Sequence, residues 1–265
     1  VSFCVAGLLI TMDVGSPFNL WRMVSLSHLQ SLMSLDFWLL CIILAVNLYY
    51  LYRVKNAGTS SPSRLLGIAA ILLPAALVSL EGWMLSTQSA HPMWGTGSVM
   101  LSFLVGALLA GLGISALISS KDSFPSSALT CLLLLSFVMV LSEVLTGIFS
   151  DTPLIREEMR LVVSGKTSVY LWVQLIFGLT IPLLLLFKTT ALRLTGVLIV
   201  SGVLAEKLWL IAAGQANPWM PEAQSLYLPS WIEIISVIGM IAVGTLLYKL
   251  ILFWGTTLNR ETRSE

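Results

Sequence analysis

Long apolar runs dominate this chain, and most of them have the length that a helix needs to cross a lipid bilayer. A helical span takes roughly 20 apolar residues, and a helix of that length satisfies its own backbone hydrogen bonds in lipid. Of the 265 residues, 57% are hydrophobic and 10% are charged, whereas a soluble domain has about 25% charged residues. We therefore expect an all-α integral membrane protein and exclude the soluble classes.

The runs predict a polytopic helical bundle of about eight transmembrane segments. The run that starts at Val1 reaches a turn signal near Pro17, so it supplies only about half of a span. Loops rich in Gly, Pro and Ser separate the other runs. We expect one membrane domain over residues 1–265, with helices at about 1–12 (partial), 33–53, 65–85, 97–119, 128–150, 166–187, 189–213 and 230–254.

The distribution of Lys and Arg predicts that the C-terminus is cytoplasmic, because cytoplasmic loops carry an excess of these residues. The outward loops are then 13–32, 86–96, 151–165 and 214–229. Nine basic residues lie on the C-terminal side and four on the other: Arg53, Lys55, Arg64, Lys121, Lys188, Arg193, Lys249, Arg260 and Arg263 against Arg22, Arg156, Arg160 and Lys166.

Five carboxylates lie inside the apolar segments, and a count of 1.5 Å per residue puts all of them in the outer half. They are Asp36, Glu81, Glu143, Glu206 and Glu233. Such acids normally face a bundle interior, a partner or a cavity, so we expect a polar pocket on the outer side. For Asp36 and Glu233, contact with interfacial water is an equally good explanation. Lys207 directly follows Glu206, and neighbours in sequence do not face each other on a helix, so no salt bridge is expected.

Tryptophan is distributed in the same uneven way. Interfacial tryptophan belts normally occupy both membrane surfaces, so the imbalance suggests an aromatic docking or ligand surface on the outer side. Trp254 lies on the inner side, and the other eight lie on the outer side: Trp21, Trp38, Trp83, Trp94, Trp172, Trp209, Trp219 and Trp231.

The chain offers few ligands for a redox centre of its own. His28 and His91 both lie in predicted outer loops, which excludes haem held by two intramembrane histidines. No Cys-rich iron–sulfur motif or other metal motif is present, and Cys4, Cys41 and Cys131 are expected to pack as small hydrophobic residues. The net charge of +1 without a basic cluster excludes nucleic acid as a partner. Electrons must therefore come from a partner subunit or a lipid-soluble carrier.

Two stretches carry more specific motifs. The first joins an Asp-Val-Gly-Ser-Pro turn at 13–17 to Trp-Arg-Met at 21–23 and Ser-Leu-Met-Ser at 31–34. The second has Glu-Gly-Trp-Met at 81–84 and Pro-Met-Trp-Gly at 92–95. Together they resemble the NrfD/PsrC family, the quinone-interacting membrane subunits of polysulfide-reductase-like complexes, with Ser16 where a basic residue is more usual. The segments 103–111 and 204–209 add a weaker resemblance.

The resemblance implies two four-helix bundles and a quinone site near the outer face, with the headgroup beside Asp13. It also implies an iron–sulfur (ferredoxin-like) subunit docked on the outward loops, further catalytic or cytochrome subunits, menaquinone or ubiquinone as the quinone, and a bacterial or archaeal cytoplasmic (inner) membrane. Family members have a further helix ahead of the first one here. We expect that this helix is missing from the chain or is supplied by another polypeptide.

The candidate site follows from the motifs and the acids together. Asp13 and Glu81 are the expected acceptors for protons released from quinol, although Asp13 could instead hold the turn as an Asx motif and Arg22 could be a surface anchor. The expected quinone-binding residues are Asp13, Arg22, Ser31, Ser34, Glu81, Trp83 and Trp94, and the expected proton-transfer residues are Asp13, Glu81, Glu143, Glu206, Lys207 and Glu233.

Three further expectations remain open. The inner half of the membrane lacks carboxylates, so a proton relay would have to be completed by Asn47, hydroxyls and water. The segment 156–160 is expected to be a solvated loop helix that could contribute to docking. A secondary transporter with an acidic substrate or ion site and a purely structural anchor are the alternative functions.

Overall fold

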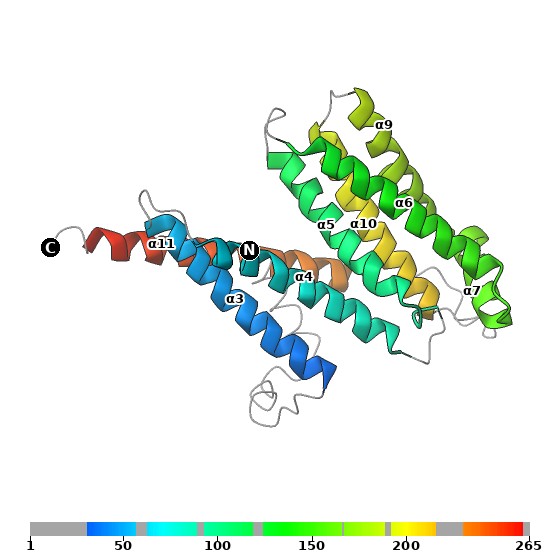
Figure 1. Ribbon diagram of the computed structural model, residues 1–265, viewed down its shortest axis with the longest axis horizontal. Coiled ribbons are helices and arrows are strands. Elements are labelled where there is room, and N and C mark those ends of the chain that lie inside the picture. The colour runs from blue at the N-terminus through cyan, green and yellow to red at the C-terminus, as the bar shows by residue number, and fades with distance from the viewer. Residues whose placement is uncertain are drawn as a thin grey trace. The chain divides into compact units, whose positions relative to one another are not determined.

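The computed structural model describes residues 31–56, 63–88, 93–118, 124–165, 167–188, 192–215 and 230–261. All regular secondary structure in these residues is helical (Figure 1). The elements are α3 (Leu32–Asn56), α4 (Arg64–Ser86), α5 (Ser98–Ile118), α6 (Ser126–Ile148), α7 (Pro153–Ser164), α8 (Ser168–Val173), the π-helix η3 (Gln174–Thr180), α9 (Ile181–Lys188), α10 (Leu192–Gln215) and α11 (Trp231–Glu261).

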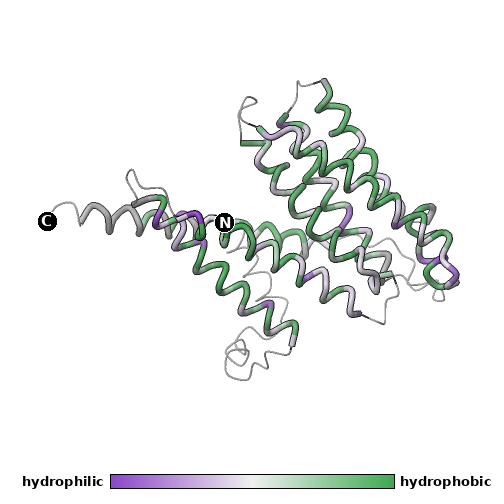
Figure 2. Tube along the Cα trace, viewed as in Figure 1, coloured by the Kyte–Doolittle hydropathy of each residue, from purple (hydrophilic) through white to green (hydrophobic). Residues whose placement is uncertain are grey.

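Within the described residues, six helical spans are long and apolar enough to cross a membrane, and α11 adds the shorter apolar stretch Ile234–Leu247. Every predicted segment from 33–53 onward is helical, so the chain is a polytopic helical membrane protein. Figure 2 shows hydrophobic residues along the spans and hydrophilic ones concentrated on α7. The predicted partial segment 1–12 lies outside the described residues.

The chain divides into two compact units. Residues Val1–Pro74 and Leu228–Glu265 form the first unit, which includes α3 and α11. Ala75–Tyr227 form the second unit, whose spans α5, α6, α8–η3–α9 and α10 run alongside one another (Figure 1). The second unit holds most of the buried hydrophobic core, including Val99, Leu109, Leu129, Leu133, Leu171 and Ile199.

Glycine pairs set the closest helix contacts of the second unit. A Cβ atom added to Gly196 of α10 would lie 2.5 Å from the carbonyl oxygen of Gly113 on α5, and one added to Gly178 of η3 would lie 2.5 Å from the Cα of Gly202. Real Cβ atoms do not approach that closely, so only glycine fits here. Lipid gives no hydrophobic drive for helices to associate, and close backbone packing of this kind is what holds such helices together.

Helix α7 contradicts one expectation from the sequence. Residues 156–160 are helical as predicted, but the helix is not solvated on all sides, because Glu158 and Met159 are 4% and 1% exposed. The buried face packs against α6, α8 and α10. Met159 fits over Gly147, where an added Cβ would lie 2.5 Å from the methionine Cε. The amphipathic pattern of α7 therefore covers the ends of the spans.

Candidate functional site

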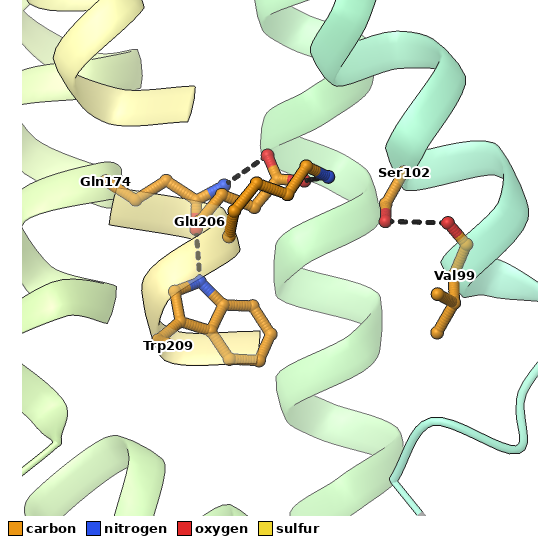
Figure 3. A network of polar contacts seen from close by, with 6 residues as sticks. Val99, Ser102, Gln174, Glu206 and Trp209 are labelled. Atoms are coloured by element: carbon orange, nitrogen blue, oxygen red, sulfur yellow. Dashed lines mark hydrogen bonds and ion pairs between the residues drawn. The ribbon is translucent and has the colours of Figure 1, made fainter. Parts of the chain in front are cut away.

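A chain of polar side chains crosses the interior of the second unit (Figure 3). The indole Nε1–H of Trp209 on α10 donates to Oε1 of Gln174 at 2.6 Å, and Nε2 of Gln174 donates to Oε2 of Glu206 at 3.0 Å. All three side chains are buried. A buried polar group is costly unless its hydrogen bonds are made, and these bonds satisfy the indole, the amide and one carboxylate oxygen together.

The remaining oxygen of Glu206 bonds to the next residue in the chain. Nζ of Lys207 lies 2.7 Å from Oε1 of Glu206, so the prediction that these neighbours form no salt bridge was wrong. The long lysine stem bends back, and its ammonium sits 3.9 Å from the centroid of the Phe103 ring on α5. The pair occupies the space beside Gly106, where an added Cβ would lie 3.5 Å from both charged atoms.

The π-helix explains how Gln174 reaches its partners. Residues 174–180 follow directly from α8, and Thr180 returns its hydroxyl to the carbonyl of Leu175 at 2.7 Å, five residues back. Short π-helical turns are frequently found at functional sites. Since Gly178 packs directly on Gly202, η3 lies close enough to α10 for Gln174 to bond to Glu206 and Trp209.

Glu143 of α6 lies between two cavities of the second unit. It lines a cavity of about 10 Å³, which has room for a single water at most, together with Ser102, Ser136, Glu206 and Trp209. It also lines an outer cleft of about 210 Å³. The other residues of the cleft are Met93, Thr96, Ser98, Thr146, Gly147, Ser150, Ile155 and Met159.

Helix α7 closes one side of this cleft and is fastened by polar contacts. The guanidinium of Arg156 donates twice to the carbonyl of Ser150, at 3.0 and 2.7 Å. The carboxyl of Glu158 accepts the backbone N–H of Met93, while its Oε2 is buried without a partner among the described residues. Burial raises the pKa of Glu158 to about 7, and the bond from Met93 opposes that rise.

The attachment of α7 is expected to weaken as the pH rises. The unfolded chain has the ordinary Glu pKa of 4.5, so stability from a protonated Glu158 is complete below that value and is lost as the pH approaches 7. The full effect is about 3 kcal/mol at most. Hydrogen exchange of α7 amides, corrected for intrinsic rates, should be faster at pH about 8 than at about 5. Glu158→Gln should remove this difference, and Glu157→Gln on the exposed face should retain it.

The predicted quinone-binding residues are distributed over both units. Asp13 and Arg22 lie outside the described residues, while Ser31 and Ser34 belong to the first unit. In the second unit, Glu81 and Trp83 lie exposed near the end of α4, and Gly82 between them packs on the backbone of Met100. Trp94 is 7% exposed, and its indole N–H already donates to the carbonyl of Leu210 at 2.8 Å.

Of the predicted proton-transfer residues, the structure brings Glu143, Glu206 and Lys207 together. Glu233 lies on α11 in the first unit, and its side chain is outside the described ones. Sequence reasoning missed Gln174, and it treated Trp209 only as an outer tryptophan. An amide inside the apolar run 166–187 was the one available signal, since a buried amide in lipid needs polar partners.

Comparison with known proteins adds the family context. Residues 1–218 match the family described as "Polysulphide reductase, NrfD". A protein of Halobacterium salinarum (strain ATCC 700922 / JCM 11081 / NRC-1), named as a "Putative dimethyl sulfoxide reductase membrane subunit", is 25% identical over 303 residues, which cover 92% of this chain and 69% of that protein.

Proposed function

The chain belongs to the NrfD polysulphide reductase family, and from this premise we propose that it is the quinone-reactive membrane subunit of a respiratory oxidoreductase complex. Membership confirms the resemblance found in the sequence motifs. The single observation that carries the proposal is the family match over residues 1–218. The name of the Halobacterium relative, a membrane subunit of a reductase, supports the same assignment.

The proposed reaction is oxidation or reduction of a menaquinone or ubiquinone near the extracytoplasmic face. In the oxidative direction the quinol gives two electrons to a docked iron–sulfur (ferredoxin-like) subunit and two protons to carboxylates of this chain. Asp13, Arg22, Ser31, Ser34 and Glu81 surround the headgroup in this proposal. Trp83, whose ring is 52% exposed, suits contact with the quinone ring better than Trp94, which is buried and already bonded.

Polar and charged groups inside the second unit support a role in proton transfer. An intramembrane ion pair and a further acid cost several kcal/mol of insertion free energy, and such groups usually mark an ion or proton pathway. Glu143, Glu206 and Lys207 meet in one place, and the first of them reaches an outer cleft. Glu233 remains a proposed member of the same pathway.

Removal of the proposed proton acceptors is expected to slow quinol oxidation. General-base catalysis contributes at least about 10²-fold, so Asp13→Asn and Glu81→Gln should each lower kcat by roughly that factor in the isolated complex. Asp122→Asn, in a predicted cytoplasmic loop, is the matched control. Steady-state kinetics with a soluble quinol would measure the effect. Unchanged kcat in both variants would remove these residues from the reaction.

Isolation of the native complex tests the functional class. We expect an iron–sulfur subunit and further catalytic or cytochrome subunits to co-purify, and a quinol analogue to bind in a saturable way. A complex that contains the iron–sulfur subunit but binds no analogue would be explained by a structural anchor. Substrate-driven cation uptake by the purified chain alone would instead indicate a transporter.

The proposed topology has about eight spans in two four-helix bundles of a bacterial or archaeal inner membrane, with a cytoplasmic C-terminus. Fusions of alkaline phosphatase, which is active only outside the cytoplasm, should be active after residue 90 and inactive after residue 260. Green fluorescent protein fused at the same sites should give the opposite pattern. Activity of the phosphatase at the C-terminus would reverse the proposed orientation.

A further inference from the structure

We infer that the two buried acids of the second unit have separate tasks: Glu206 is a fixed hydrogen-bond acceptor held by Gln174, Trp209 and Lys207, and Glu143 is the group that binds and releases the proton. The inference rests on the proton transfer in the proposed function and names its carrier. It also assigns Gln174 and Trp209 as positioning residues.

The direction of the hydrogen bonds follows from the chemistry of Trp209. An indole nitrogen can only donate, so the Gln174 atom 2.6 Å from it must be the amide oxygen. The amide nitrogen of Gln174 then faces Glu206, at 3.0 Å from Oε2. This nitrogen is a donor without acceptor capacity, so Oε2 of Glu206 has to accept.

The second oxygen of Glu206 is committed in the same way. Its Oε1 lies 2.7 Å from Nζ of Lys207, and an ammonium group only donates. The Phe103 ring 3.9 Å from Nζ and the bare backbone of Gly106 keep the ammonium in place. A proton on either oxygen of Glu206 would point at an existing N–H donor, so proton binding there requires a bond to break.

Glu143 has the opposite surroundings. Within the described part of the chain, no hydrogen bond fixes either of its carboxylate oxygens, and its residue surface is partly exposed. It contacts both the outer cleft and the small cavity that also contains Glu206. Water in the cleft can therefore deliver or remove a proton at Glu143 without disturbing the network behind it.

The charges favour this division. Glu206 and Lys207 are neutral as a pair, so a protonated Glu143 leaves the whole group neutral, and an ionised Glu143 adds one negative charge near Lys207. The step is a proton transfer only. An O–H bond forms at the carboxylate of Glu143 and breaks when the proton passes to cleft water, and no electrons move within this chain.

Infrared difference spectroscopy of the intact complex tests the assignment of the carrier. A protonated carboxyl group has a C=O band that shifts when water is exchanged for D₂O, and the signal is independent of turnover. We expect a pH-dependent band that disappears in Glu143→Gln, shifts in Glu143→Asp and remains in the neutral double variant Glu206→Gln/Lys207→Met. A band lost in that double variant but retained in Glu143→Gln would overturn the inference.

A second set of variants tests the positioning residues. Gln174→Met keeps the length of the side chain but removes its donor, so Glu206 should bind a proton and a second carboxyl band should appear. Adding Trp209→Phe removes the stranded indole N–H, so the thermal midpoint should partly recover while the second band persists. Asn47→Leu and Trp172→Phe are the matched controls, because Asn47 bonds to its own helix and Trp172 to Val163.

A merely structural role would lower the midpoint in Gln174→Met without any new band, and that result would contradict the positioning role. Failure of the proposed function is distinguishable, because it would abolish quinol-dependent changes while the pH-dependent band of Glu143 remained assignable.

Discussion

Replacing Lys207 by methionine is expected to destabilise the protein by about 3 kcal/mol, which would make it one of the most damaging single substitutions of a charged residue in the second unit. Removal of one partner from a buried ion pair typically costs about 3–5 kcal/mol, because the other charge is left uncompensated. We expect the lower end of that range, since 25% of the Lys207 side chain is exposed while only 6% of Glu206 is. The methionine preserves the apolar stem that packs near Phe103.

The double variant Glu206→Gln/Lys207→Met should recover most of the lost stability. It removes both charges, and neutral replacement of a buried pair is often neutral or stabilising. Reversible unfolding in detergent would provide the double-mutant cycle. Lys249→Met, at an exposed position of α11, should stay within about 0.5 kcal/mol of the natural protein. A double variant as unstable as Lys207→Met alone would show that the loss comes from packing.

Replacing Gly178 by alanine is expected to cost about 3 kcal/mol, the upper end of the range for overpacked cores. The added methyl group would meet the Cα of Gly202 at 2.5 Å, and a backbone atom cannot rotate away as a side chain could. Separation of η3 from α10 would also lengthen the bond from Gln174 to Glu206. The variant should therefore lose both stability and the carboxylate environment of the natural protein.

Gly111→Ala on α5 is the matched control, because an added Cβ there meets nothing within 4 Å. Alanine has the higher helix propensity, so this variant should be as stable as the natural protein or slightly more so. Thermal unfolding of both variants in the same detergent measures the difference. Equal midpoints for Gly178→Ala and Gly111→Ala would mean that the close glycine contact does not hold the helices together.

The hydrogen-bond network shows where sequence reasoning stopped. Glu206 was a candidate from the sequence alone, since a carboxylate in an apolar run needs an explanation. Its bond to Gln174 joins residues 32 positions apart, and no local pattern encodes that pairing. The salt bridge to Lys207 was excluded because Cβ atoms of neighbouring residues diverge, and that argument overlooked the length of a lysine side chain that can bend back over Phe103.

Helix α7 gives the same lesson for a loop. Its charges predicted a solvated helix, and the helix is present. Its location over the ends of the spans buries Glu158, whose raised pKa depends on the surrounding protein and not on the local sequence.

The sequence by itself determined the helical spans, the membrane as solvent and the family, because these depend on the length of apolar runs and on local motifs. Tertiary structure decided which acids meet, which oxygens are already bonded and which carboxylate still reaches the outer cleft. The physical reason is that proton affinity and hydrogen bonding act over a few ångströms. Only the packing of α5, α6, η3 and α10 brings residues distant in sequence within that range.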